Sequence, residues 1–240
     1  MICYEISTCY FTNLNQFDIL IYMDKTPLKI EQMFNNIARM YDFNNNIMSF
    51  GQHIRIKKKA VKYLKAKNTK VLDVCTGTGD IAGFFDKSCD VTGIDFSEKM
   101  LEIANKKYPW VEFTKADCTN LPFKDNTFDI VTISFGLRNI ENYSKALDEI
   151  YRVLKPNGIF MHLDFGKKNF LGDCLFDLII PHLVKIFYKN ILPYEYLVKS
   201  KQLFFNENAL IGLFKEHNLH LKEKHTMLFG GASCQICQKL

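Results

Sequence analysis

The sequence predicts an α/β protein with a seven-stranded, mostly parallel, Rossmann-like sheet, helices on both faces of the sheet and a helical N-terminal extension. Two observations support this fold class. Short apolar runs alternate with helix-like segments from residue 71 onward, which is the pattern of successive strand–helix units. A glycine-rich turn, Gly77-Thr78-Gly79, follows the first apolar run, at the place where such folds bind their ligands.

Hydrophobic periodicity and turn residues give the order of the elements. Residues 28–67 are expected to be helical, with a break at Asp42–Asn46. Strands are expected at 71–74, at 91–95, from 111, at 128–134 and at 159–165, helices from 80, at 98–108, 143–154 and 207–217, and two closing strands within 219–238. A turn is expected at 155–158, where proline and glycine are both tolerated. We therefore predict a single domain over residues 28–240 and an N-terminal extension over 1–27. Its first 22 residues are either a loose, disordered extension or a wrongly assigned start, and nothing in them carries chemistry.

Composition excludes several classes of protein. The chain has 240 residues, 48% hydrophobic and 24% charged, which suits a globular protein with a core of its own. The net charge is +5, but arginine, which reads bases with paired hydrogen bonds, is scarce, so no nucleic-acid partner is expected. No signal peptide and no spanning apolar run are visible, and the cysteines are scattered, so we expect a cytoplasmic protein with reduced thiols.

The glycine turn and a later aspartate indicate a site for a nucleotide-like cofactor. Gly77 and Gly79, with Thr78 between them, let the backbone approach a ligand closely. Asp95 ends the next expected strand, where a carboxylate accepts hydrogen bonds from the two hydroxyls of a ribose. The glycine spacing also fits a NAD site, so the glycines alone leave the cofactor open.

The carboxylates beside the turn favour S-adenosylmethionine. Asp73 precedes the turn and Asp80 follows it at a helix N-terminus, where NAD would place its pyrophosphate. Carboxylates there repel phosphate, whereas S-adenosylmethionine carries a positive sulfonium and a positive amino group. Asp117 and Cys118, after the third strand, are expected to bind the adenine through a carboxylate and a backbone N–H. Ser134, which ends the fourth strand, completes the expected cofactor-binding set.

Several longer motifs occur in a recognisable order. They are Phe34–Asp42, Ser49-Phe50-Gly51, Asp73–Asp80, Val131–Ile140, Arg152–Gly158 and Tyr194–Leu197. Together they resemble the UbiE/MenG family of class I S-adenosylmethionine-dependent methyltransferases. The resemblance implies the class I methyltransferase fold and C-methylation of a polyprenylated quinol, either demethylmenaquinol or the 2-methoxy-6-polyprenyl benzoquinol. Ile56-Lys57 and the closing Cys234–Lys239 depart from the family pattern in regions expected to shape the acceptor pocket.

The acceptor chemistry selects two candidate catalytic residues. A quinol carbon becomes a nucleophile when a neighbouring hydroxyl loses its proton, so the site must stabilise a phenolate and hold the ring. Arg138 lies just past the fourth strand, and its guanidinium would stabilise a phenolate or activate a water, although it is no base itself. A structural salt bridge is the alternative for Arg138. Tyr41 is the second candidate, with core packing as its alternative, and Asp42 and Tyr196 are weaker ones.

Other functions and partners stay open at the level of sequence. The alternatives are a class I methyltransferase acting on a different small or lipidic molecule, and a non-catalytic S-adenosylmethionine-binding protein. No metal site is expected, because Cys234-x-x-Cys237 is a lone pair, for which buried packing is favoured over a redox role. Leu171–Tyr188 is an apolar segment interrupted by Pro181, either an internal helix or a surface for peripheral contact at the inner face of the membrane.

Overall fold

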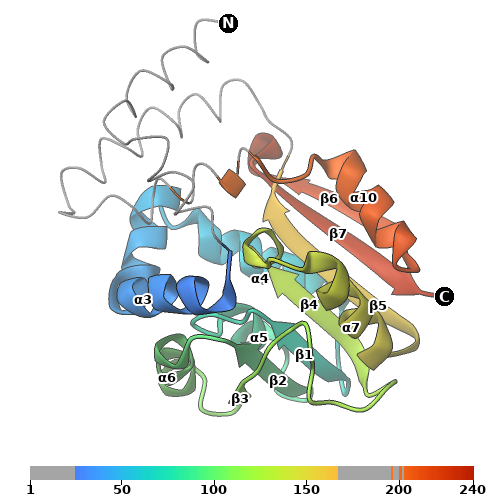
Figure 1. Ribbon diagram of the computed structural model, residues 1–240, viewed down its shortest axis with the longest axis horizontal. Coiled ribbons are helices and arrows are strands. Elements are labelled where there is room, and N and C mark those ends of the chain that lie inside the picture. Colours follow the sequence, from blue (N-terminus) through green and yellow to red (C-terminus); the bar gives the residue numbers. More distant parts are fainter. Residues whose placement is uncertain (1–24, 167–195, 197–199, 202) are drawn as a thin grey trace, which may run out of the picture.

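The computed structural model describes residues 25–166, 196, 200, 201 and 203–240 of the chain (Figure 1). Within these residues, seven strands form one sheet in the order β3-β2-β1-β4-β5-β7-β6. The strands are β1 (Lys70–Val74), β2 (Asp90–Asp95), β3 (Glu112–Lys115), β4 (Phe128–Ser134), β5 (Leu154–Phe165), β6 (Leu219–Met227) and β7 (Ala232–Lys239). This sheet confirms the predicted fold class and the two closing strands.

The sheet is parallel except where β7 is inserted. β1 pairs in parallel with β2 and β4, β2 with β3, and β4 with β5, whereas β7 is antiparallel to both β5 and β6. The strand order reverses beside β1, because β2 and β3 lie on one side of it and β4 and β5 on the other. Such a switch point leaves a crevice outside the carboxyl ends of the strands, where ligands bind.

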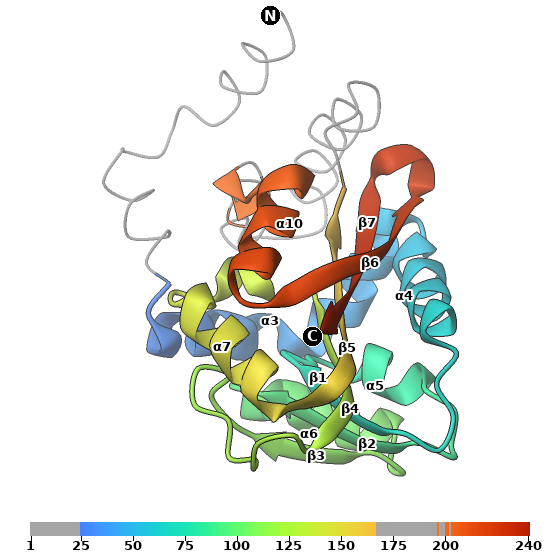
Figure 2. The same cartoon turned by 90° about the vertical axis from the view of Figure 1, so that its right-hand side faces the viewer.

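Helices cover both faces of the sheet (Figure 2). They are α3 (Pro27–Ser49), α4 (Gln52–Leu64), α5 (Asp80–Phe84), α6 (Glu98–Lys107), α7 (Tyr143–Val153) and α10 (Glu207–Glu216), with short 3-10 turns η1 (Leu137–Asn139) and η2 (Leu228–Gly230). α7 and α10 pack on one face with Leu72 and Phe160, and α4 and α5 pack on the other with Val71 and Met161. Adjacent strand residues thus enter two separate cores, as the alternation of side chains requires.

The prediction of a helix break at Asp42–Asn46 is wrong. α3 continues to Ser49, and the chain turns at Phe50 and Gly51, where φ is 48° and 71°. The polar side chains do not end the helix because they bond to other elements instead of the local backbone. Thr78 donates a hydrogen bond to Asp42, and Asn46 Oδ1 lies 3.0 Å from a ring nitrogen of His53.

The turn expected at residues 155–158 is also wrong, because these residues lie within β5. Leu154 is opposite Phe128 and Ile159 is opposite Ile130, so the strand bulges between these two pairs. Asn157 takes a left-handed φ of 64° in the bulge. A bulge is one of the few places in a strand that tolerates proline, so the turn residues deform the strand without ending it.

Two predicted regions lie wholly or mostly outside the described residues. The apolar segment Leu171–Tyr188 is one, and the extension over 1–27 is described only from Lys25. Across the described part of the chain, no helix combines the length and apolarity needed to cross a membrane.

Candidate active site

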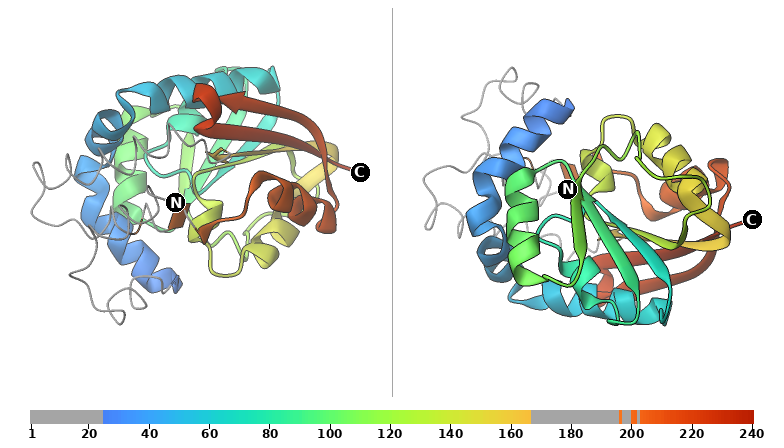
Figure 3. Two further views of the ribbon diagram at one scale, coloured as in Figure 1. Left: turned by 90° about the horizontal axis from the view of Figure 1, so that it is seen from above. Right: turned by 90° about the horizontal axis from the view of Figure 1, so that it is seen from below.

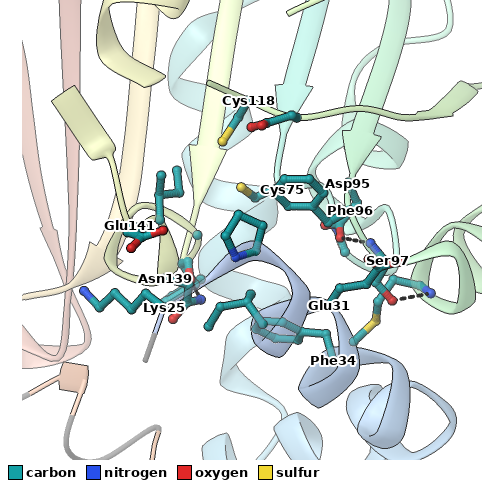
Figure 4. A pocket seen from close by; sticks show the side chains of 18 of the residues that line it. Lys25, Glu31, Phe34, Cys75, Asp95, Phe96, Ser97, Cys118, Asn139 and Glu141 are labelled. Atoms are coloured by element: carbon teal, nitrogen blue, oxygen red, sulfur yellow. Dashed lines mark hydrogen bonds between the residues drawn. The ribbon is translucent and has the colours of Figure 1, made fainter. Parts of the chain in front are cut away.

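A cavity lies at the carboxyl edge of the sheet, at the switch point (Figure 4). The ends of four strands and the loops after them supply half of the lining residues: Cys75, Gly77, Asp95, Phe96, Ser97, Asp117, Cys118, Thr119, Ser134, Phe135 and Gly136. Ile30, Phe34 and Tyr41 of α3 supply another part. Six of the predicted site residues therefore line one cavity: Tyr41, Gly77, Asp95, Asp117, Cys118 and Ser134.

Asp95 joins the glycine turn to the next loop. Its Oδ2 accepts a hydrogen bond from the N–H of Gly77 at 2.8 Å, and its Oδ1 accepts one from the N–H of Ser97 at 2.9 Å. Burial raises the pKa of the Asp95 carboxyl, while these backbone donors favour its ionised form. Gly77 has a φ of 57°, which glycine adopts without strain. The aspartate and the turn therefore form one hydrogen-bonded unit beside the cavity.

The side chains that line the cavity are mainly acidic among their charged members, which favours a positively charged ligand. Among its described residues are four acidic side chains, Glu31, Asp95, Asp117 and Glu141, against one lysine, Lys25. A pyrophosphate would meet repulsion here, whereas a positive sulfonium would be attracted. Asp73 and Asp80, on which the sequence-based preference for S-adenosylmethionine rested, do not line the cavity, and its acidic character comes from other carboxylates.

Helix α3 is fastened over the cavity and runs beside α6 (Figure 3). Ser97 Oγ donates a hydrogen bond to Asn35 Oδ1 at 2.7 Å, which ties α3 to the loop after β2. Lys107 Nζ lies 2.6 Å from Asp42 Oδ2, which ties α3 to α6. These contacts fix the position of Tyr41 in the wall.

Asp80 and Thr78 lie in an ionic cluster outside the cavity lining. The Asp80 carboxylate is 2% exposed and lies 2.8 Å from Lys57 Nζ and 2.7 Å from Lys107 Nζ. Burial opposes its ionisation, but the two lysines hold the pKa of Asp80 well below its usual range. Thr78 Oγ1 donates to Asp42 at 2.7 Å. The charge of Asp80 is thus compensated within the protein, and both residues order the glycine turn from outside the cavity.

Asp73 and Gly79 also lie outside the lining. Asp73 accepts hydrogen bonds at 2.6 Å from the hydroxyls of both Thr76 and Thr132, and burial raises its pKa to about 6. Gly79 has a φ of 81°, and a Cβ there would lie 2.8 Å from the ring of Phe113. Both residues therefore shape the glycine turn without lining the cavity.

The loops after β3 and β4 place three predicted residues in the wall. Asp117 Oδ1 accepts the N–H of Thr119 at 2.7 Å and its hydroxyl at 2.8 Å, which forms a tight local turn. Cys118 is 4% exposed and packs on the core beneath the cavity. The hydroxyl oxygen of Ser134 is buried without a hydrogen-bond partner among the described residues.

Arg138 forms a buried salt bridge, which was the alternative to a catalytic role for this residue. Its Nη1 lies 2.7 Å from Asp164 Oδ1, and the two side chains are 6% and 1% exposed. The guanidinium also lies over the rings of Phe135 and Phe165, 5.8 and 5.1 Å from their centroids. Arg138 is not in the lining, but Phe135 is. Arg138 Nε and Asp164 Oδ2 are buried without partners in the described part of the chain.

Sequence reasoning missed several lining residues. Asn139, the neighbour of Arg138 in the chain, lies in the wall, and its Oδ1 accepts a hydrogen bond from the hydroxyl of Tyr196 at 3.0 Å. Burial raises the pKa of that hydroxyl to about 12. Lys25 and Phe96 were not singled out, because neither belongs to a motif with a chemical rationale. The helical period of Ile30 and Phe34 was visible, but a period alone does not distinguish a core face from a cavity wall.

The Cys234-x-x-Cys237 pair is separated by the sheet. Cys234 packs in the core beneath α4 and Cys237 in the core beneath α10, and burial raises the pKa of each thiol to about 12. Both are packing residues. No group of three or more potential metal ligands lies together among the described residues.

The fold and the cavity define a class of protein. The structure is similar to that of an S-adenosylmethionine-dependent methyltransferase from Thermotoga maritima, titled a possible histamine N-methyltransferase, with a TM-score of 0.65 over 88% of this chain and 100% of that one. At 21% identity this likeness shows the fold, that of the class I methyltransferases. The sequence comparisons are more specific.

The model of the ubiE/COQ5 methyltransferase family matches residues 22–239. The chain belongs to this family of S-adenosylmethionine-dependent methyltransferases. It is 37% identical over 231 residues to the ubiquinone/menaquinone biosynthesis C-methyltransferase UbiE of Campylobacter jejuni, covering 88% of this chain and 98% of that one. It is 40% identical over 201 residues to the demethylmenaquinone methyltransferase of Staphylococcus aureus, covering 78% and 83%. The resemblance found in the motifs is confirmed.

Proposed function

We propose that the protein transfers a methyl group from S-adenosylmethionine to a ring carbon of a polyprenylated quinol. The observation that carries this proposal is the acidic cavity at the switch point of a chain of this family. The relatives that support it are named for menaquinone and ubiquinone biosynthesis.

The lining offers candidate groups for the ribose, the adenine and the sulfonium of the cofactor. The carboxylate of Asp95, already oriented by two backbone N–H groups, would accept the ribose hydroxyls. Asp117, whose Oδ1 is engaged by Thr119, would accept from the adenine amino group through its other oxygen, and the N–H of Cys118 would donate to the ring. When bound, S-adenosylmethionine supplies an electrophilic methyl group on a positive sulfur, and the acidic lining favours that charge.

The acceptor side must stabilise a phenolate. Arg138 adjoins the lining residues Phe135 and Asn139, and Asp164 and two aromatic rings restrict its guanidinium to one position. Asp164 compensates the charge at Nη1, so the group that Arg138 would offer to a developing phenolate is its Nε–H, which has no partner among the described residues and needs little reorganisation. Tyr41, which α3 holds in the wall, would donate a hydrogen bond to a ring oxygen.

The proposal is tested by methyl transfer from labelled S-adenosylmethionine. The acceptors are a short-chain demethylmenaquinol, a demethylated benzoquinol and a blank, each quinol also being supplied as the oxidised quinone. Label should enter a quinol only, because the quinone has no hydroxyl to ionise. Calorimetry with S-adenosylmethionine and NADH should show binding of the first alone. If S-adenosylmethionine bound but no methyl group reached either quinol, the proposed substrate would be wrong and the proposed cofactor would stand.

A membrane-borne substrate also calls for contact with the bilayer surface. We propose that Leu171–Tyr188 makes this contact, supported by its apolar sequence and by nearby lysines such as Lys199 and Lys201. The protein should co-sediment with anionic vesicles at low salt and be released at high salt. Phe187→Glu should weaken this binding. Equal sedimentation of the variant would exclude the segment as the contact.

A further inference from the structure

Two cysteines distant in the sequence meet inside the cofactor cavity. Cys75 follows β1 and Cys118 lies in the loop after β3, and both line the cavity. Figure 4 shows their two sulfur atoms facing the same space, and the neighbouring Cys118 thiol together with burial raises the pKa of the Cys75 thiol. Neither forms a disulfide in the structure.

The surroundings keep the two thiols in contact. Cys118 and Cys75 pack on the same apolar core, and Gly136 lies against Cys75. A Cβ on Gly136 would lie 2.5 Å from the Cys75 Cβ, so the backbone of that loop lies directly against the cysteine. Cys75 also has a left-handed φ of 55°, which fixes where its side chain points. Cys75 therefore has little freedom to move away from Cys118.

We propose that Cys75 and Cys118 form an oxidisable dithiol, which a hydroperoxide converts to a disulfide that weakens the binding of S-adenosylmethionine. One thiol reduces the peroxide to a sulfenic acid and releases water, or alcohol from an organic peroxide. The second thiol attacks the sulfenic sulfur, forms the S–S bond and releases water. Two thiols lose two electrons and two protons in total, and a dithiol reductant reverses the change.

The effect on cofactor binding follows from where the two residues lie. A disulfide brings two sulfurs to about 2.05 Å, closer than any hydrogen-bonded contact, so at least one wall must shift. One wall is the glycine turn bonded to Asp95 and the other carries Asp117. Binding linkage is reciprocal, so if oxidation weakens cofactor binding, bound cofactor must protect the thiols to the same extent. This inference rests on the proposed cofactor site.

The test treats the full, reduced chain with hydrogen peroxide and maps disulfides by mass spectrometry without reduction. We expect a peptide linking Cys75 to Cys118, formed more slowly when S-adenosylmethionine is saturating. Calorimetry should show at least about a tenfold loss of cofactor affinity on oxidation, recovered with dithiothreitol. In Cys75→Ser and Cys118→Ser, or the matching alanine variants, oxidation should not change the affinity, whatever its starting value. Cys89→Ser, outside the cavity, should respond like the unaltered chain.

Two results would overturn the inference. One is absence of the linked peptide under conditions that oxidise Cys89, and the other is a linked protein whose affinity for S-adenosylmethionine changes less than twofold. Failure of the reduced chain to bind S-adenosylmethionine would instead overturn the proposed cofactor. The two failures can be told apart, because the disulfide-linked peptide is detected in the absence of S-adenosylmethionine.

Discussion

The two halves of the carboxyl edge of the sheet differ in how their polar groups are satisfied. On the β1–β2–β3 side, Asp95 and Asp73 are held by backbone N–H groups and hydroxyls, and Asp80 by two lysines. On the β4–β5 side, Arg138 and Asp164 each keep a buried polar atom without a partner in the described part of the chain, as do Ser134 and His162.

The difference indicates two kinds of site. A half with satisfied carboxylates is preorganised, so it binds its ligand with little rearrangement. A half with unpaired buried donors and acceptors carries a desolvation cost of about 1–3 kcal/mol for each group. Of the four residues, only Ser134 lines the cavity, so a ligand bound there directly reaches only its hydroxyl. We expect the first half to hold the cofactor and the second half to hold the acceptor.

The largest expected effect is on the acceptor half. Arg138→Ala should lower turnover at least about a hundredfold while the affinity for S-adenosylmethionine changes less than about twofold. It should also lower the free energy of unfolding by about 3–5 kcal/mol, because Asp164 is left charged and buried. Arg138→Lys keeps the charge but not the planar fork, and Arg152→Lys, on half-exposed α7, is its control. Full turnover in Arg138→Lys would reduce the role to a generic charge.

The next effect is on the stability of the cofactor half. Asp80→Ala should lower the free energy of unfolding by about 3 kcal/mol, because it leaves Lys57 buried without its counter-ion. The matched variant is Asp42→Ala, which removes a carboxylate 32% exposed and paired with the same Lys107. It should cost less than about 1 kcal/mol. Urea unfolding measures both, and equal losses would show that burial does not govern this cluster.

A third effect is on cofactor affinity. Asp95→Ala should weaken the binding of S-adenosylmethionine by about 2 kcal/mol, roughly thirtyfold, because a charged acceptor for the ribose is lost. Asp90→Ala, at the exposed opposite end of β2, is the control. Calorimetry would contradict the ribose assignment if the Asp95 variant bound within twofold of the unaltered chain.

The smallest effect concerns pH. Burial raises the pKa of Asp73 to about 6, so the folded chain binds this proton more tightly than the unfolded chain. The stability it contributes is present at low pH and is lost as pH rises through 6. Relative to Asp73→Asn, the unaltered chain should therefore lose about 1 kcal/mol between pH 5 and pH 8.

The comparison with Asp73→Asn also isolates the aspartate. Burial lowers the pKa of His53 to about 4, so its contribution is present above pH 6.5 and is lost as pH falls, which is the opposite sign. His53 is present in both proteins and cancels in the difference. If the difference in unfolding free energy between the two proteins did not vary with pH, Asp73 would have the same pKa in the folded and the unfolded chain.

Much of the fold could be predicted from the sequence because its signals are local. β4 at Phe128–Ser134 has the predicted bounds, and α6 starts at the predicted Glu98, because each is an apolar pattern with its own boundary residues. The break at Asp42–Asn46 failed because Asp42 bonds to Thr78, far along the chain. Local propensity cannot register a partner of that kind.

The sequence by itself determined the fold class, the position of the glycine turn and the family, since these rest on residue type and spacing along one chain. Only the tertiary structure decided which carboxylates face the cavity. It turned Asp80 toward two lysines and left Asp95 and Asp117 in the lining. It also separated Cys234 from Cys237 and brought Cys75 to Cys118. The reason is that a side chain's partners depend on the packing of distant elements, which spacing along the chain does not encode.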